Sequence, residues 1–114
     1  MQLPKDAQLL RILIGESDKA GHVPLFEALV LKAREMQLAG ATVLRGPMGY
    51  GHSSRLHSAK ILDLSSDLPV VVEIVESDDN IRAFLAEVEP MLGSALVTLE
   101  KVQVLVYGPP GNNG

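Results

Sequence analysis

The stretch Val70-Val71-Val72-Glu73-Ile74-Val75 decides the fold. Five of its six side chains are β-branched, and such a run is typical of a strand in the middle of a sheet. Residues 65–69, Ser-Ser-Asp-Leu-Pro, precede it and indicate a turn. A short apolar run at 9–14, closed by Gly15, predicts a second strand. A third strand is expected over 97–107, where valines alternate with other residues.

Two amphipathic helices separate these strands. The first is predicted over 24–38, with Pro24 in its first turn and Gly40 as the left-handed residue that ends it. The second is predicted to begin at Ser77 or Asp78 and to continue through Val88 until Pro90 perturbs it.

Strands are also predicted at 41–45 and, from a weaker pattern, at 55–64. The element order β-α-β-β-α-β predicts an α+β protein with the ferredoxin-like sandwich, a mainly antiparallel sheet carrying two helices on one face. Residues 1–107 are expected to form this single domain and 108–114 a disordered tail. Since one face of the sheet remains uncovered, self-association is expected.

Composition excludes several classes of protein. Ten Lys and Arg against fourteen Asp and Glu give a net charge of −4, which disfavours binding to nucleic acid. The absence of cysteine excludes disulfides, thiolate metal sites and cysteine nucleophiles. Residues 1–6 lack the basic stretch and long apolar run of a signal peptide, and no later apolar run reaches transmembrane length, so a cytoplasmic protein is expected.

Residues 45–57 form the segment that composition does not explain. Glycine lets backbone amides approach an anion, arginine offers a planar pair of donors, and serine hydroxyls add more. The segment therefore indicates a site for a small anionic ligand; a mobile hairpin loop whose glycines only turn the chain is the alternative. The candidate ligand-binding residues are Arg45, Gly46, Gly49, Gly51, His52, Ser53, Ser54, Arg55 and His57.

Other chemistries fit less well. Residues 49–54 approach the dinucleotide fingerprint, with Ser54 in place of the third glycine and Glu73 as the ribose-binding acid, but the segment does not open the domain. His22 pairs with neither loop histidine at helical spacing, so a metal site within one chain is not indicated, although copies meeting at an axis can assemble one. No nucleophile elbow is present. No enzyme is predicted.

Three motifs carry a resemblance to a known family. The motifs are Ala39-Gly40-Ala41-Thr42-Val43, the run from Arg45-Gly46 to Leu56-His57, and residues 64–75. Together they resemble the PII-like family catalogued as domain of unknown function one-ninety, and the resemblance covers about residues 8–107. The resemblance implies a ferredoxin-like fold, a homotrimer similar to the nitrogen-regulatory PII proteins, and no established catalytic activity.

The resemblance also implies where a ligand and a partner bind. In PII relatives the base of the hairpin loop and the loop before the last strand bind an adenine nucleotide between subunits, which adds Gly93 and Ser94 as candidates. In the last strand Lys101 stands where PII proteins place several basic residues, so a nucleotide of low charge is favoured. The 45–57 loop is the implied contact for a partner protein, and the family's association with fluoride-export channels makes a membrane transporter or channel a candidate.

These observations lead to one hypothesis and one alternative. The hypothesis is a non-enzymatic, trimeric PII-like signalling protein, without a cofactor, that binds a small anionic metabolite such as an adenine nucleotide in its intersubunit clefts. The alternative is a structural adaptor for a membrane or soluble partner with no metabolite ligand.

Overall fold

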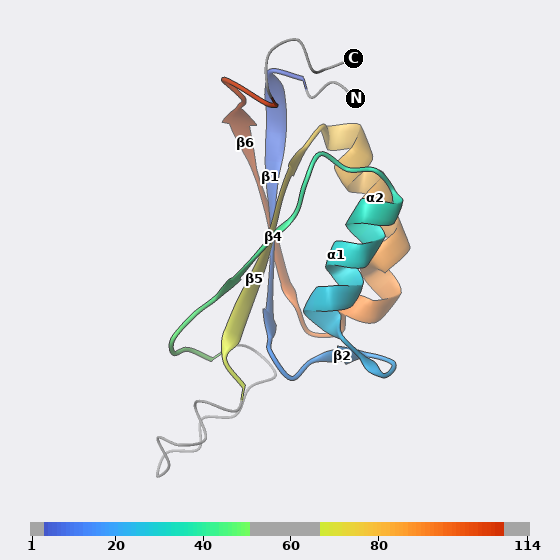
Figure 1. Cartoon of the computed structure of the whole chain (residues 1–114), viewed down its shortest axis with the longest axis vertical. Helices are drawn as coiled ribbons and strands as arrows, with labels where there is room; N and C mark the ends of the chain where they lie inside the picture. Colours follow the sequence, from blue (N-terminus) through green and yellow to red (C-terminus); the bar gives the residue numbers. More distant parts are fainter. Residues whose placement is uncertain (1–3, 51–66, 109–114) are drawn as a thin grey trace.

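The computed structural model describes residues 4–50 and 67–108. Within these residues a sheet of four strands carries two helices on one face, and a two-stranded hairpin precedes the first helix (Figure 1). The elements are, in chain order, β1 (Asp6–Gly15), β2 (Lys19–Ala20), β3 (Val23–Pro24), α1 (Leu25–Glu35), β4 (Thr42–Arg45), β5 (Pro69–Glu76), α2 (Asp78–Leu92) and β6 (Leu96–Gln103).

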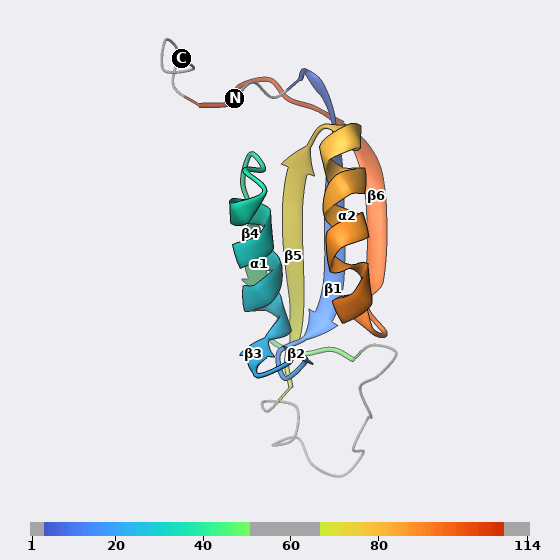
Figure 2. The same cartoon turned by 90° about the vertical axis from the view of Figure 1, so that its right-hand side faces the viewer.

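The strand order in the sheet is β4-β5-β1-β6, and all three neighbouring pairs are antiparallel. Figure 2 shows α1 and α2 side by side on the same face. This confirms the predicted α+β, ferredoxin-like arrangement. It also leaves the other face, here called the open face, without a covering element among the described residues.

The core lies between this sheet and the helices. Side chains alternate across each strand, so β5 buries Val70, Val72 and Ile74 toward the helices and leaves Glu73 and Val75 half-buried on the open face. The helices contribute apolar faces at three- and four-residue spacing. The buried apolar cluster is Leu10, Ile12, Ile14, Leu25, Leu29, Ala33, Val70, Val72, Ile74, Ile81, Phe84 and Val88.

Helix α1 ends earlier than predicted and with a different residue. It stops at Glu35, and the left-handed conformation falls on Gln37 (φ 59°), not on Gly40. The Gln37 and Leu38 amides donate to the Arg34 and Ala33 carbonyls, which is the Schellman pattern of helix termination. The half-buried Leu38 packs against the core, and this contact favours the early stop.

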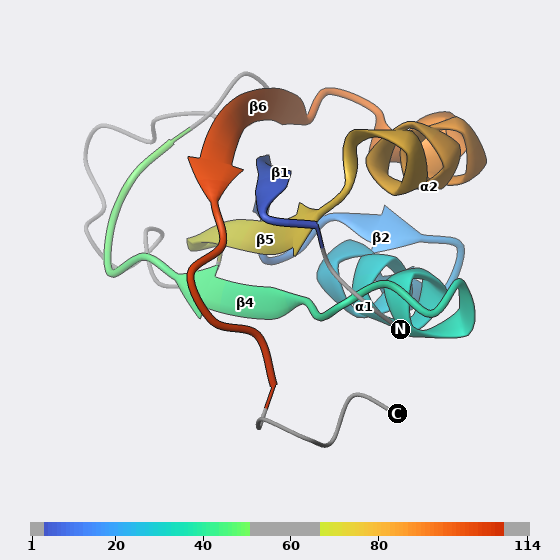
Figure 3. The same cartoon turned by 90° about the horizontal axis from the view of Figure 1, so that it is seen from above.

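Helix α2 and strand β6 also depart from the prediction. Pro90 lies inside α2, which continues to Leu92; a proline in the last turn removes a single backbone hydrogen bond close to the helix end. Strand β6 ends at Gln103, not at residue 107, because β1 begins at Asp6, opposite Gln103. The segment beyond loses its strand partner and crosses the end of the sheet toward β4 (Figure 3).

Two predictions lie outside the described residues: the strand at 55–64 and the tail from 109 onward. None of the helices that the structure describes is long and apolar enough to cross a membrane.

Candidate functional site

A groove of about 650 Å³ lies on the open face, where the sheet meets the chain that follows β6. Strands β1, β4 and β5 supply its floor, the connection from α1 to β4 supplies one wall, and the end of β6 with the following segment supplies the other. The residues lining it are Leu9, Ala39, Gly40, Ala41, Thr42, Glu73, Val75, Val102, Gln103, Val104, Leu105, Val106 and Tyr107.

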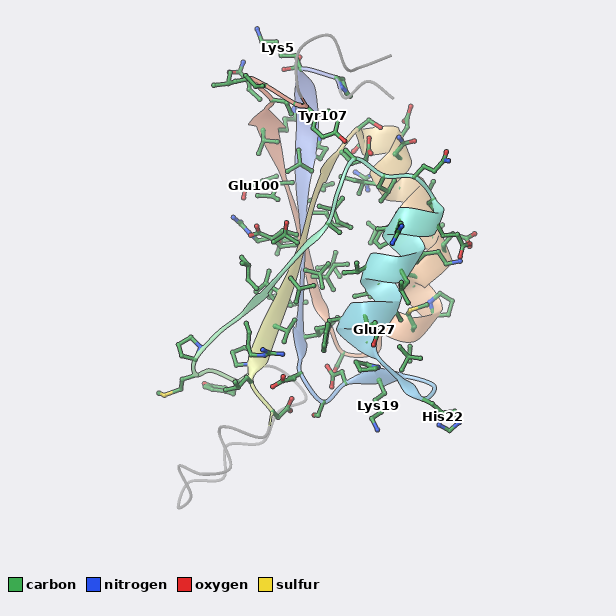
Figure 4. All side chains as sticks on the ribbon, viewed as in Figure 1. Lys5, Lys19, His22, Glu27, Glu100 and Tyr107 are labelled. Atoms are coloured by element: carbon green, nitrogen blue, oxygen red, sulfur yellow. The ribbon has the colours of Figure 1, made fainter. Side chains whose placement is uncertain are left out.

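The wall at residues 39–41 is held from both sides. The Ala39 amide donates to Oε1 of Glu76 over 2.8 Å, and the Ala39 carbonyl accepts from the Tyr107 hydroxyl over 2.7 Å. Figure 4 labels Tyr107 beside this connection. A backbone segment fixed at its amide and its carbonyl presents a defined surface to the groove.

The floor carries one charged side chain, the carboxylate of Glu73. Its Oε2 atom accepts a hydrogen bond of 2.9 Å from Nε of Arg11, which also donates to Glu100 over 2.7 Å. The hydrogen bond to Glu73, together with the charge of Glu100, raises the pKa of Arg11 above its ordinary value, against the opposing effect of desolvation. The three groups form a charged band across the open face.

Among the residues that the structure describes, the lining contains no Lys, Arg or His, while Leu9, Val75 and Val102 give it apolar sides. The polar side chains of the lining are those of Thr42, Glu73, Gln103 and Tyr107, and the backbone of 39–41 adds further polar groups. Such a surface fits a flat, uncharged group that needs hydrogen-bond partners at its edge, and its volume is in the usual range for small-molecule sites.

Arg45, predicted to bind an anion, forms an ion pair with Glu16 at 2.6 Å. It ends β4 about 10 Å along the strand from Thr42, by the usual rise per residue. Gly46 donates its amide to the Pro69 carbonyl over 2.8 Å, and a Cβ there would come within 2.9 Å of Pro69 Cγ. Gly49 also packs on Pro69, so these two glycines let the chain approach β5 closely.

The remaining predicted ligand residues that the structure describes, Gly93, Ser94 and Lys101, lie apart from Arg45 in a single chain. Gly93 and Ser94 lie in the connection from α2 to β6, and the start of β6 is at the same end of the sheet as Arg45, three strand spacings or about 14 Å from β4. Lys101 lies opposite Gln8, toward the other end. Gly51, His52, Ser53, Ser54, Arg55 and His57 lie outside the described residues.

Sequence reasoning missed most of the groove. None of the lining residues is among the predicted ligand residues, although Thr42 and Glu73 lie in two of the motifs that carry the family resemblance. Alternation in two strands was an available signal, because it places Thr42 and Glu73 on the same face, where they lie opposite each other. The role of Tyr107 depends on a contact 68 residues away in the chain, which no local pattern reports.

Within residues 4–50 and 67–108 no three His, Asp or Glu side chains gather closely enough to hold a metal ion.

Comparison with known proteins identifies relatives over most of the chain. A model of the DUF190 family, described as "Uncharacterized ACR, COG1993", matches residues 7–104. A UPF0166 protein of Aquifex aeolicus is 39% identical over 98 residues, which cover 86% of this chain and 92% of that protein. The UPF0166 protein MJ1524 of Methanocaldococcus jannaschii is 32% identical over 79 residues, covering 69% and 72% of the two chains.

Solved structures share the fold at lower sequence identity. CPII of Thiomonas intermedia K12, bound to ADP, AMP and acetate, superposes with a TM-score of 0.64 and 17% identity, covering 96% of this chain and 95% of that chain. A PII-like signaling protein of Thermus thermophilus, described as putative, gives a TM-score of 0.60 and 17% identity, covering 87% and 89%. The similarity confirms the PII-like fold that the sequence motifs predicted.

Proposed function

The chain belongs to the DUF190 family, and from this premise we propose that it is a non-enzymatic, PII-like regulatory protein that binds an adenine nucleotide, with the base in the groove on the open face. The groove and its lining are the observation that carries the proposal.

The chemistry of the lining favours the base over the phosphates. No basic residue is among the described lining residues, and the nearby Arg11 guanidinium is already paired with Glu73, so a phosphate group there finds no free cation among them. An adenine ring instead packs between apolar side chains such as Leu9 and Val75. Its edge finds donors and acceptors on Thr42, Glu73 and the 39–41 backbone.

The fold comparison supports the same class of ligand. CPII, which shares this fold, was solved with ADP and AMP bound. Of the adenine nucleotides, those with few phosphates suit this chain best, because Lys101 is the only basic side chain of β6.

The phosphates are assigned to cations outside the groove. Arg45 ends β4, which is an edge strand, so a ligand whose base lies at Thr42 reaches Arg45 by passing around that edge. The remaining donors of the 45–57 loop, with Arg55 the second arginine, complete the proposed anion site.

The proposed assembly is a homotrimer. Leu13, Leu44 and Leu96 lie on the open face with exposed fractions of 37%, 48% and 58%. A second copy placed on this face covers these side chains and closes the open side of the groove, which places the ligand between subunits. A partner protein, a membrane transporter or channel being the suggested class, is assigned to the 45–57 loop.

One observation favours the alternative of an adaptor without a metabolite. Arg45, a predicted anion ligand, is already paired with Glu16. Nucleotide binding distinguishes the two functions, because the regulatory protein requires it and the adaptor does not.

Isothermal titration with adenosine, AMP, ADP, ATP and cyclic AMP tests the proposal. AMP and ADP should release or absorb heat with wild type, and Thr42→Val should weaken binding by about 0.5–1.5 kcal/mol, the usual net value of a hydrogen bond. Thr98→Val is the matched control, since Thr98 lies on the same face outside the groove lining. If no nucleotide gives a heat signal, nucleotide binding is excluded from the proposal and the adaptor function is favoured.

A further inference from the structure

Two side chains far apart in the sequence meet at a single residue of the groove wall. Glu76, at the end of β5, accepts from the Ala39 amide, and Tyr107, after β6, donates to the Ala39 carbonyl. Ala39 is thus held from the sheet on one side and from the C-terminal segment on the other, although it lies in neither a helix nor a strand.

Glu76 is a rigid support for this contact. Its side chain is 0% exposed, and besides Ala39 it accepts from the Ser77 amide over 2.8 Å and from the Asn80 side-chain amide over 3.1 Å. A buried carboxylate is costly unless its oxygens are bonded, so the three donors fix its orientation. The wall is thereby tied to the start of α2.

Tyr107 holds the opposite wall in place. The segment after β6 begins with the Val104 amide donating to the Lys5 carbonyl over 2.7 Å and reaches the Ala39 carbonyl at Tyr107. It is therefore attached at both ends, and the side chains between them line the groove. Tyr107 itself lines the groove and is 47% exposed, so it belongs to the groove wall and not to the buried core.

We propose that Glu76 and Tyr107 are positioning residues that act through Ala39, setting the separation of the two groove walls and so the affinity for the ligand's base. The ligand part of this inference rests on the proposed function. The effect on the wall itself does not, because the contacts are made in the ligand-free protein.

Three variants test the proposal in the full chain. Tyr107→Phe removes only the hydroxyl from a half-exposed ring. Glu76→Gln keeps one acceptor oxygen but replaces the other with an amide group, which cannot accept a hydrogen bond from the donors that Glu76 binds. Thr98→Val is the control, because Thr98 carries an exposed hydroxyl on the same open face and does not line the groove.

The first measurement is the affinity for AMP. Loss of one hydrogen bond predicts about three- to tenfold weaker binding for Tyr107→Phe and a similar loss for Glu76→Gln. Because both act on Ala39, the double variant should lose less than the product of the two single effects. An unchanged affinity in Tyr107→Phe, or fully multiplicative effects, overturns the proposal; a loss confined to Tyr107→Phe and Glu76→Gln, with Thr98→Val unaffected, supports it.

The second measurement needs no ligand. The Ala39 amide, bonded to Glu76, should exchange its hydrogen about three- to tenfold faster in Tyr107→Phe than in wild type or Thr98→Val. Equal exchange rates overturn the positioning role. If wild type binds no nucleotide, the proposed function fails and this exchange rate alone decides whether the two residues position the wall.

Discussion

Arg45 and Glu16 form an ion pair of 2.6 Å at the end of β4, between the residue that opens the 45–57 segment and the chain that follows β1. Both side chains are partly exposed, so the pair contributes little to stability. The pair instead affects ligand binding, because a guanidinium that is already bonded to a carboxylate is less available to a phosphate.

The first prediction separates the two roles of Arg45. Arg45→Ala should weaken AMP and ADP binding by about 1.5–3 kcal/mol, as expected for the loss of a charged hydrogen bond, while Glu16→Gln should tighten it by releasing the guanidinium. Titration calorimetry measures both. Equal weakening in the two variants would instead mean that the pair serves only to shape the end of β4.

The second prediction concerns Gly93, a residue that the family resemblance places in the ligand site. Its φ of 59° and ψ of −120° lie where a side chain is strained, although a Cβ there meets no atom within 4 Å. Gly93→Ala should therefore lower the free energy of unfolding by about 1–2 kcal/mol through backbone strain alone.

Gly40→Ala is the control for Gly93→Ala. Its Cβ also meets nothing within 4 Å, and its φ is not in the left-handed region, so stability should be unchanged or slightly higher. Urea unfolding of the two variants gives the comparison. Equal stabilities would show that the conformation of Gly93 carries no strain.

The third prediction follows from the end of α1. Gln37 occupies a left-handed position that favours glycine, so Gln37→Gly should raise the free energy of unfolding by about 0.5–1 kcal/mol. Arg34→Gly, at an exposed position inside the same helix, should lower it by about 1 kcal/mol. Thermal or urea unfolding distinguishes the two; a loss of stability in both would contradict the Schellman termination.

The boundaries of the elements show why the fold was predictable and its ends were not. The β-branched run at β5 and the apolar face of α1 repeat over many residues, so either pattern predicts its element without knowledge of the rest. The end of α1 near Gln37 depends on the packing of Leu38 against the core. The end of β6 depends on the residue at which β1 begins. Those are contacts between distant segments, which a local pattern does not contain.

The groove, like the ends of the elements, depends on contacts between distant segments. The unusual composition of the glycine-rich segment predicts a ligand site, yet in the part of it that the structure describes Gly46 and Gly49 pack on Pro69. The groove is lined by common residues whose importance comes from the register of β4 on β5 and from the contact between Tyr107 and Ala39. Spatial convergence of ordinary side chains leaves no compositional signal.

The last prediction concerns assembly. If the open face is the trimer interface, Leu44→Asp should shift the protein toward monomers, because it places a charge among apolar side chains that the neighbouring copy covers. Light scattering at micromolar concentration should give three times the monomer mass for wild type.

Leu31→Asp provides the matched control: Leu31 is 53% exposed, close to the 48% of Leu44, but it lies on α1, away from the open face. A monomeric wild type, or equal behaviour of the two variants, would contradict an interface on this face and with it the placement of the ligand between subunits. Conversely, a trimer lost only in Leu44→Asp, together with AMP binding lost in the same variant, would show that a second copy completes the groove.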